Sequence, residues 1–231
     1  MIQVKTHKPL KLRISIPDPR DIFAPVLSDR TIVRMMHRGK LITTPINVNQ
    51  LQPNSVDLTL ADTWSKPLPN TYHGEPGTVT EKNAIRVDRE TKYRTGEFER
   101  STGILGMDPR HKPWYTIMPG EFVLMASREE LNIPNGILAF VQGRSSMARL
   151  SIQTEQAGLI DAGFKGTITF EVFNEGEYPL TLFSGMRVAQ LYFFRAQRAS
   201  IAYGLSKGSK YSGQIVATGS KIHMDPEFRG C

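Results

Sequence analysis

Cysteine is almost missing from this 231-residue chain, because Cys231, its last residue, is the single one. One cysteine excludes an internal disulfide framework and a cysteine-based metal cluster, and such usage is typical of a reducing compartment. No apolar run approaches the ~18 residues of a membrane-spanning helix, and the N-terminus has no apolar signal-peptide core. These absences predict a globular cytoplasmic protein (in the host cytoplasm if the source is viral) without a membrane partner.

Zinc ligands at a recognisable spacing are also missing. His73-Gly-Glu75 matches the His-x-Glu half of the zinc nucleobase-deaminase signature, but the Pro-Cys-x-x-Cys half is absent. The remaining histidines show no ligand spacing; they are His7, His37, His111 and His223. We therefore expect no zinc, and hydrolytic chemistry here must work without a zinc-bound water.

The basic residues do not form a continuous run in the sequence. Lys and Arg number 29 against 22 Asp and Glu, a net charge of +7, but they are scattered. A nucleic-acid surface favours a basic run or aromatic residues interleaved with arginine. The compact cluster is residues 143–149, Gly-Arg-Ser-Ser-Met-Ala-Arg, in which glycine allows close backbone approach, arginines fork onto phosphate oxygens and serines donate to them. This favours a small phosphorylated ligand over nucleic acid; the alternative is a strand end running into a charged surface turn.

Hydrophobic periodicity predicts a mainly β fold with a short N-terminal helix. The helix begins after Ser28, which can cap it, and ends at Gly39. Residues 55–60 alternate with period two, and short apolar runs separated by Pro, Gly and Asp turns follow from Trp114 onward. Many short strands at this spacing indicate a distorted β-barrel or jelly-roll-like fold.

Composition divides the chain into three parts. Residues 1–26 are basic and contain proline, which predicts an N-terminal extension. Residues 27–203 form the predicted barrel domain, with a polar insertion at 65–113. Residues 204–231 begin with a Gly/Ser/Lys-rich stretch and are predicted to be a flexible C-terminal tail.

Two carboxylates follow the 143–149 cluster. Glu171 lies mid-strand, with Phe170 and Val172 on the opposite face. If Glu171 points inward, desolvation raises its pKa toward the range that a general acid–base needs; if it points to water, it is an ordinary surface group. Periodicity does not decide between the faces. Asp161 lies in an Ile-Asp-Ala-Gly turn, where ordinary turn chemistry is the alternative.

Four motifs in order, spanning roughly residues 27–223, resemble the dCTP deaminases of the trimeric dUTPase superfamily. The first two are Leu27-Ser-Asp-Arg30 and Ser55-Val-Asp57. The third is the 143–149 cluster followed by residues 157–171, Ala-Gly-Leu-Ile-Asp-Ala-Gly-Phe-Lys-Gly-Thr-Ile-Thr-Phe-Glu. The fourth is a tyrosine, a lysine seven residues on and a glutamine four further: Tyr203, Lys210 and Gln214.

The resemblance implies a dUTPase-type barrel that assembles as a homotrimer with active sites shared between subunits. It implies hydrolytic deamination of dCTP to dUTP and ammonia, with Glu171 as general acid–base and Ser145 and Arg149 positioning the water and the base. Mg²⁺ would be bound through the oxygens of the triphosphate. The resemblance also implies feedback inhibition by dTTP and a tail that closes over the nucleotide. The other implied substrate contacts are Arg144, Ser146, Met147, Ala148, Ala157, Asp161, Thr169, Phe170, Gln190, Tyr203, Lys210 and Gln214.

The sequence departs from the family pattern between Arg149 and Asp161. This link is one residue shorter than in the deaminases and reads Glu155-Gln-Ala157 where they usually have Thr-Ala, which leaves the choice of base open. Gly158 resembles the bifunctional members that continue to dUMP and diphosphate, since a small residue leaves room for a second water. A plain dUTPase needs no glutamate at position 171, and a non-catalytic, nucleotide-sensing regulatory relative is the third reading.

Overall fold

The computed structural model describes residues 24–68, 90–99, 112–205 and 208–228. Most of the predicted 1–26 extension and much of the 65–113 insertion therefore lie outside the described residues. Strands dominate the described part, which confirms the mainly β prediction. The elements are α2 (Asp29–Met36), β1 (Leu41–Ile42), η1 (Val48–Gln50), β2 (Ser55–Pro67), β3 (Tyr93–Glu97), β4 (Trp114–Ile117), β5 (Phe122–Asn132), β6 (Ile137–Gly143), α3 (Ser145–Ala148), β7 (Ile152–Gln153), β8 (Leu159–Ile160), β9 (Lys165–Asn174), β10 (Leu180–Phe183), β11 (Arg187–Arg195), η3 (Ile222–Met224) and η4 (Pro226–Phe228).

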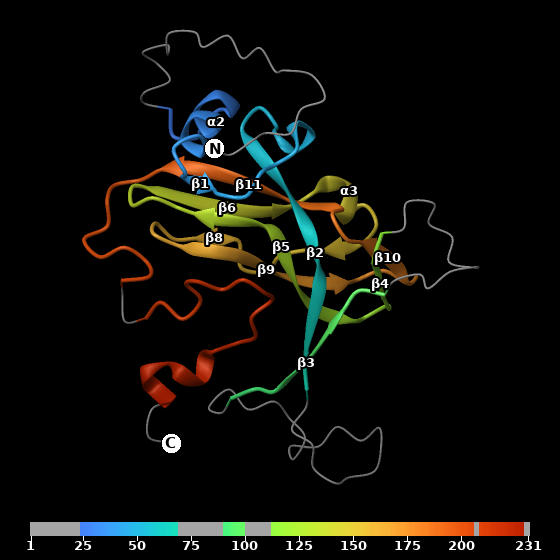
Figure 1. The fold of residues 1–231 in the computed structure, drawn as a ribbon. Coiled ribbons are helices and arrows are strands. Elements are labelled where there is room, and N and C mark those ends of the chain that lie inside the picture. Colours follow the sequence, from blue (N-terminus) through green and yellow to red (C-terminus); the bar gives the residue numbers. More distant parts are fainter. Residues whose placement is uncertain (1–23, 69–89, 100–111, 206–207, 229–231) are drawn as a thin grey trace.

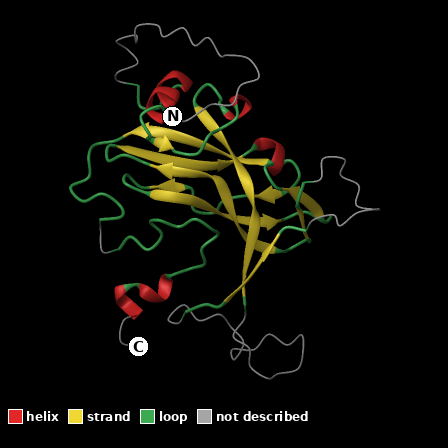
Figure 2. Cartoon of the chain, viewed as in Figure 1, coloured by secondary structure: helices red, strands yellow, loops and turns green. Residues whose placement is uncertain are grey.

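The main sheet curls into the distorted barrel that the strand pattern predicts. Its strand order is β7-β9-β5-β2-β11-β6-β8, with β1 paired to β5 and β3 paired to β2, and all of these pairs are antiparallel. A separate pair, β4 and β10, flanks it. Figure 2 shows the helices at the margins of this curled body of strands.

The predicted N-terminal helix is confirmed as α2. Ile32 and Met36, one turn apart on one face, are fully buried in the core. Ser28 precedes the helix with an extended backbone, but its side chain makes no capping hydrogen bond. Gly39 follows with φ of 67°, a left-handed conformation that glycine adopts at little cost.

Part of the polar 65–113 stretch belongs to the sheet. β2 continues to Pro67, and β3 pairs with its second half from Thr63↔Glu97 to Pro67↔Tyr93. We call residues 63–67 and 93–97 the β2–β3 arm. It projects from the barrel in Figure 1, and Phe98, directly after it, is buried at 3% exposure.

The C-terminal tail folds back onto β9. Gln214 forms a bridge with Gly166, its backbone carbonyl accepts from Thr167 N at 2.9 Å, and its side chain donates to Thr167 O at 2.7 Å. The described chain then passes Tyr93 and ends in η3 and η4. The tail thus pairs with the first residues of β9 and lies beside this strand.

Candidate functional site

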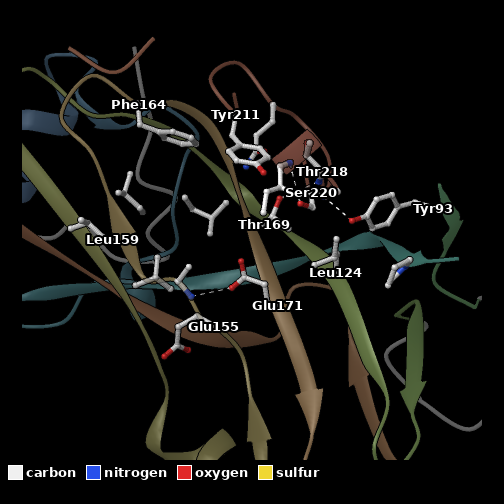
Figure 3. A pocket seen from close by; sticks show the side chains of 18 of the residues that line it. Tyr93, Leu124, Glu155, Leu159, Phe164, Thr169, Glu171, Tyr211, Thr218 and Ser220 are labelled. Carbon is white, nitrogen blue, oxygen red and sulfur yellow. Dashed lines mark hydrogen bonds between the residues drawn. The ribbon is translucent and has the colours of Figure 1, made fainter. Parts of the chain in front are cut away.

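A pocket of about 630 Å³ opens beside β9. Its walls come from β5 and β9, from the chain between residues 155 and 164, from the β2–β3 arm and from the tail. Figure 3 shows Glu155, Thr169, Glu171, Tyr93 and the tail residues around this space. The predicted site residues that line it are Ala157, Asp161, Thr169, Glu171, Tyr203 and Gln214.

Glu171 faces this pocket because of the alternation along β9. Phe170 and Val172, at 0% and 1% exposure, point into the core, so Thr169 and Glu171 point out of it. Glu171 Oε2 accepts from Gln156 N at 2.9 Å and from Ala157 N at 3.4 Å. The two amides fix the orientation of the carboxylate, and Oε1 has no protein partner among the described residues.

The shortened link supplies those amides while it is held against β6. Val141 N donates to Gly158 O at 2.8 Å, and Gln142 Nε2 donates to Glu155 Oε1 at 3.2 Å. A Cβ built on Gly158 would lie 2.4 Å from Val141 O, so any larger residue would have to move a backbone. Close packing on β6 therefore explains why position 158 is a glycine, whether or not the protein continues to dUMP and diphosphate.

The predicted phosphate grip is not in this pocket. None of residues 144–149 lines it. Arg149 and the two serines are exposed on α3, and Arg149 donates within its own helix, to Ser145 O at 3.2 Å. Within one chain, the structure therefore does not bring Ser145 and Arg149 to Glu171.

Arg144 is anchored beside a buried carboxylate. Its Nε lies 3.6 Å from Asp57 Oδ2, and its Nη1 donates to Arg187 O at 3.1 Å. Arg187 Nη1 approaches the same Oδ2 at 3.0 Å, while the buried Asp57 Oδ1 has no hydrogen-bond partner among the residues that the structure describes. The Ser55-Val-Asp57 motif thus orients the first arginine of the cluster. The register of β11 puts Gln190 opposite Asp57, half-buried and outside the pocket.

Two predicted contacts have side chains that a ligand does not reach. Phe170 is fully buried in the core, and Met147 is 2% exposed on the buried side of α3. Only the backbone of these residues is available to a ligand. The helix that presents Ser145, Ser146 and Ala148 outward must bury its Met147 side, which explains the position of Met147.

Lys210 is bound by another residue of the C-terminal tail. Its Nζ donates to both oxygens of Asp225, at 2.7 and 2.8 Å, and this hydrogen bond raises the pKa of Lys210 above its ordinary value. Lys210 does not line the pocket, whereas Tyr203 does, and its ring packs at a tilt against Phe164 with ring centroids 5.9 Å apart. A ligand that binds Lys210 would share its ammonium group with Asp225 or replace that partner.

Several pocket residues gave no signal in the sequence. Tyr93 comes from a stretch without apolar periodicity, and Tyr211 and residues 218–220 come from the Gly/Ser-rich tail. Their place in the pocket depends on long-range packing, which local patterns do not encode. Within the described ranges, no cluster of three or more His, Cys, Asp or Glu side chains could hold a metal ion, and no helix is long and apolar enough to cross a membrane.

Comparison with known proteins matches the pocket-bearing domain to one family. The dCTP deaminase-like family matches residues 26–196, which include Glu171, α3 and the shortened link. The chain belongs to this family. The match stops before the tail, so the placement of Tyr203 and Gln214 rests on the geometry above.

The alignments with individual relatives cover almost the whole length of those relatives. A protein of Aquifex aeolicus named "dCTP deaminase, dUMP-forming" is 36% identical over 88% of this chain and 98% of its own. A "dCTP deaminase" of Halorubrum lacusprofundi is also 36% identical, over 88% of this chain and 94% of its own. The solved 2′-deoxycytidine 5′-triphosphate deaminase of Agrobacterium tumefaciens superimposes with a TM-score of 0.54 at 21% identity, covering 74% of this chain and 48% of that one. This last likeness shows the fold.

Proposed function

We propose that this protein hydrolyses dCTP to dUTP and ammonia without zinc, with Glu171 as the general acid–base. The observation that carries the proposal is Glu171 itself, turned out of the core into a 630 Å³ pocket and held there by two backbone amides. Relatives 36% identical are named dCTP deaminases, which supports the same substrate class.

In this reaction a single carboxylate, that of Glu171, transfers two protons one after the other. Water attacks C4 of cytosine and forms the C4–O bond while Glu171 takes its proton. Glu171 gives this proton to N3; it then takes the hydroxyl proton and gives it to the departing amino group, so that the C4–N4 bond breaks and ammonia leaves. Apolar residues of the pocket wall such as Leu124 and Ile168 limit bulk water, and the Gln156 and Ala157 amides hold the carboxylate in place.

The phosphate grip would come from a neighbouring subunit. One chain keeps Ser145 and Arg149 out of the Glu171 pocket, and both are exposed and available to a partner. A homotrimer with shared sites brings the two halves together, with magnesium carried in on the phosphate oxygens of the substrate. Feedback by dTTP would act at the same nucleotide site. The cytoplasmic location stays a prediction.

A product assay separates this function from its alternatives. The protein is incubated with dCTP or dUTP and Mg²⁺, and ammonia, dUTP, dUMP and diphosphate are measured. Ammonia with dUTP indicates a deaminase, and ammonia with dUMP indicates the bifunctional reaction named for the Aquifex relative. Diphosphate from dUTP alone indicates a plain dUTPase, and no product indicates a nucleotide-sensing binder.

Replacing Glu171 tests the mechanism. Glu171→Gln keeps the shape and an acceptor for the two amides but does not shuttle a proton, so ammonia release should fall by at least the ~10²–10⁴-fold of general acid–base catalysis. Glu177→Gln, at an exposed position outside the pocket, is the matched control and should be unchanged. Ammonia release that survives in a folded Glu171→Gln protein contradicts the mechanism.

A further inference from the structure

Tyr93, the first residue of β3, is the point at which the β2–β3 arm meets the tail. Its hydroxyl accepts from Ser220 N at 2.7 Å, drawn as a dashed line in Figure 3. Its ring lies directly on Gly219, since a Cβ built on that glycine would be 2.2 Å from Tyr93 Cε2. One side chain thus holds two consecutive tail residues, by a hydrogen bond and by contact.

The tail segment that Tyr93 holds is also a wall of the Glu171 pocket. Thr218, Gly219 and Ser220 line the pocket, as does Tyr93. Thr218 N donates to Thr169 Oγ1 at 3.1 Å, and Thr169 shares a face of β9 with Glu171, two residues away. The position of this wall relative to the carboxylate therefore depends on contacts to β9 and to the arm.

A small apolar cluster lies beneath the same contact. Ala217, 9% exposed, packs with Leu124 and Ala126 of β5, and Tyr93 and Phe122 pack against this group. The cluster is separate from the main core. It gives the tail an apolar anchor on β5, and the Tyr93 ring of the arm packs against it.

We infer that Tyr93 is a positioning residue that fastens residues 217–220 over the Glu171 pocket, so that the polar arm serves nucleotide binding. The effect on nucleotide binding rests on the proposed function; the fastening itself does not. Because Tyr93 acts on the wall rather than on the reacting atoms, its loss raises KM for the nucleotide and leaves kcat nearly unchanged.

Limited proteolysis tests the fastening without any assumption about activity. Trypsin cleavage after Lys221, followed by mass spectrometry on the nucleotide-free protein, reports how often the tail opens. Tyr93→Phe removes the hydrogen bond to Ser220 and should speed cleavage about threefold to tenfold, the range that a net hydrogen bond gives; Tyr93→Ala should speed it further. Tyr178→Phe, on a tyrosine that is 75% exposed, is the control for loss of a hydroxyl and should match the wild type. Cleavage in Tyr93→Ala at the wild-type rate overturns the proposal.

A double-mutant cycle tests whether the ring packing carries the effect. Gly219→Ala should also speed cleavage, because the added methyl collides with the Tyr93 ring. In a Tyr93→Ala background the same change should add less than about twofold, since the ring is gone. An equal effect of Gly219→Ala in both backgrounds overturns the packing contact.

Kinetics with dCTP and Mg²⁺ then test the consequence for the site. Tyr93→Ala should raise KM about fivefold or more with kcat within about twofold of the wild type, and Tyr93→Phe should fall between them. A loss of kcat at unchanged KM overturns the positioning role. A wild-type protein that releases no ammonia contradicts the proposed function instead, while the proteolysis result still decides the fastening.

Discussion

Glu129 and Glu171 lie on neighbouring strands, β5 and β9, yet their surroundings give the two carboxyl groups different tasks. Glu129 is 4% exposed and accepts from Gln50 Nε2, Thr59 Oγ1 and Thr59 N at 2.7 to 2.8 Å. Burial raises the pKa of Glu129 despite these hydrogen bonds. Its donors come from η1 and β2, so Glu129 ties β5 to both of these elements.

Removing Glu129 should therefore cost stability. Glu129→Ala leaves the Thr59 amide and the Gln50 side chain without their acceptor, which costs about 1–3 kcal/mol of unfolding free energy. Urea denaturation measures it. Glu130→Ala, at the exposed neighbouring position, is the control and should change stability by less than about 0.5 kcal/mol. Equal losses in the two variants would contradict a role for the buried acceptor.

The close packing of Gly158 leads to a second prediction about the stability of a single-residue variant. Gly158→Ala brings a methyl within 2.4 Å of the Val141 carbonyl, so β6 or the link must shift, at a cost of about 1–3 kcal/mol. Gly143→Ala is a milder comparison, because its Cβ meets the ends of the Glu155 and Thr154 side chains at 3.0 Å, and these can move. Urea denaturation should rank Gly158→Ala as the less stable variant; the reverse order would show that the link adapts.

At the scale of elements, Glu121 ties three strands together at one end of the barrel. It lies before β5, forms an ion pair with Lys66 of β2 and accepts from Tyr115 Oη of β4 at 2.5 Å. Met118 N donates to its other oxygen at 2.6 Å. Burial alone would raise the pKa of Glu121, but the hydrogen bonds from Lys66, Tyr115 and Met118 outweigh it and lower the pKa below the ordinary 4.5.

This shift predicts a pH dependence of stability. A carboxyl group with a lowered folded-state pKa contributes stability that is present above its unfolded pKa and lost as the pH falls through the folded value. The difference in unfolding free energy between the wild type and Glu121→Gln should therefore be largest above about pH 5 and shrink as the pH falls below about 4.5. Urea titrations at a series of pH values measure it. A difference that grows on acidification would contradict the assignment.

The strands themselves were predictable to different degrees. Each apolar run after Trp114 became a strand, because period-two burial and the turn residues act locally. The β2–β3 arm was predicted only as part of a polar insertion of long loops or a hairpin, because Lys66, Arg94 and Glu97 mark it as polar and its pairing joins segments about 30 residues apart in sequence. Cation–π contacts, rather than an apolar face, hold the arm together: the charged groups of Lys66 and Arg94 lie within 5.7 Å of the Trp64 ring centroid.

At the scale of the whole molecule, the separation of Arg149 from the Glu171 pocket predicts complementation between subunits. Glu171→Gln and Arg149→Ala should each lack deaminase activity. Co-expressed at equal levels with two affinity tags, the purified mixed trimers should regain about a third of the wild-type activity, because one of the three shared sites in each mixed trimer takes an intact Glu171 from one chain and an intact Arg149 from the other. Gel filtration with light scattering gives the number of subunits. Mixed oligomers without activity would show that one chain supplies both residues.

The sequence by itself determined the strands that have apolar periodicity, the helix α2 and the identity of the residues that could act on a phosphorylated nucleotide. It did not determine which face of β9 is inside, because alternation with period two is the same for either choice, and only the packing of Phe170 and Val172 into the core turned Glu171 outward. The tertiary structure also decided that Tyr93 and the tail meet at this pocket while residues 144–149 do not. Such contacts join segments distant in sequence, and their geometry follows from how the sheet curls, which no local pattern records.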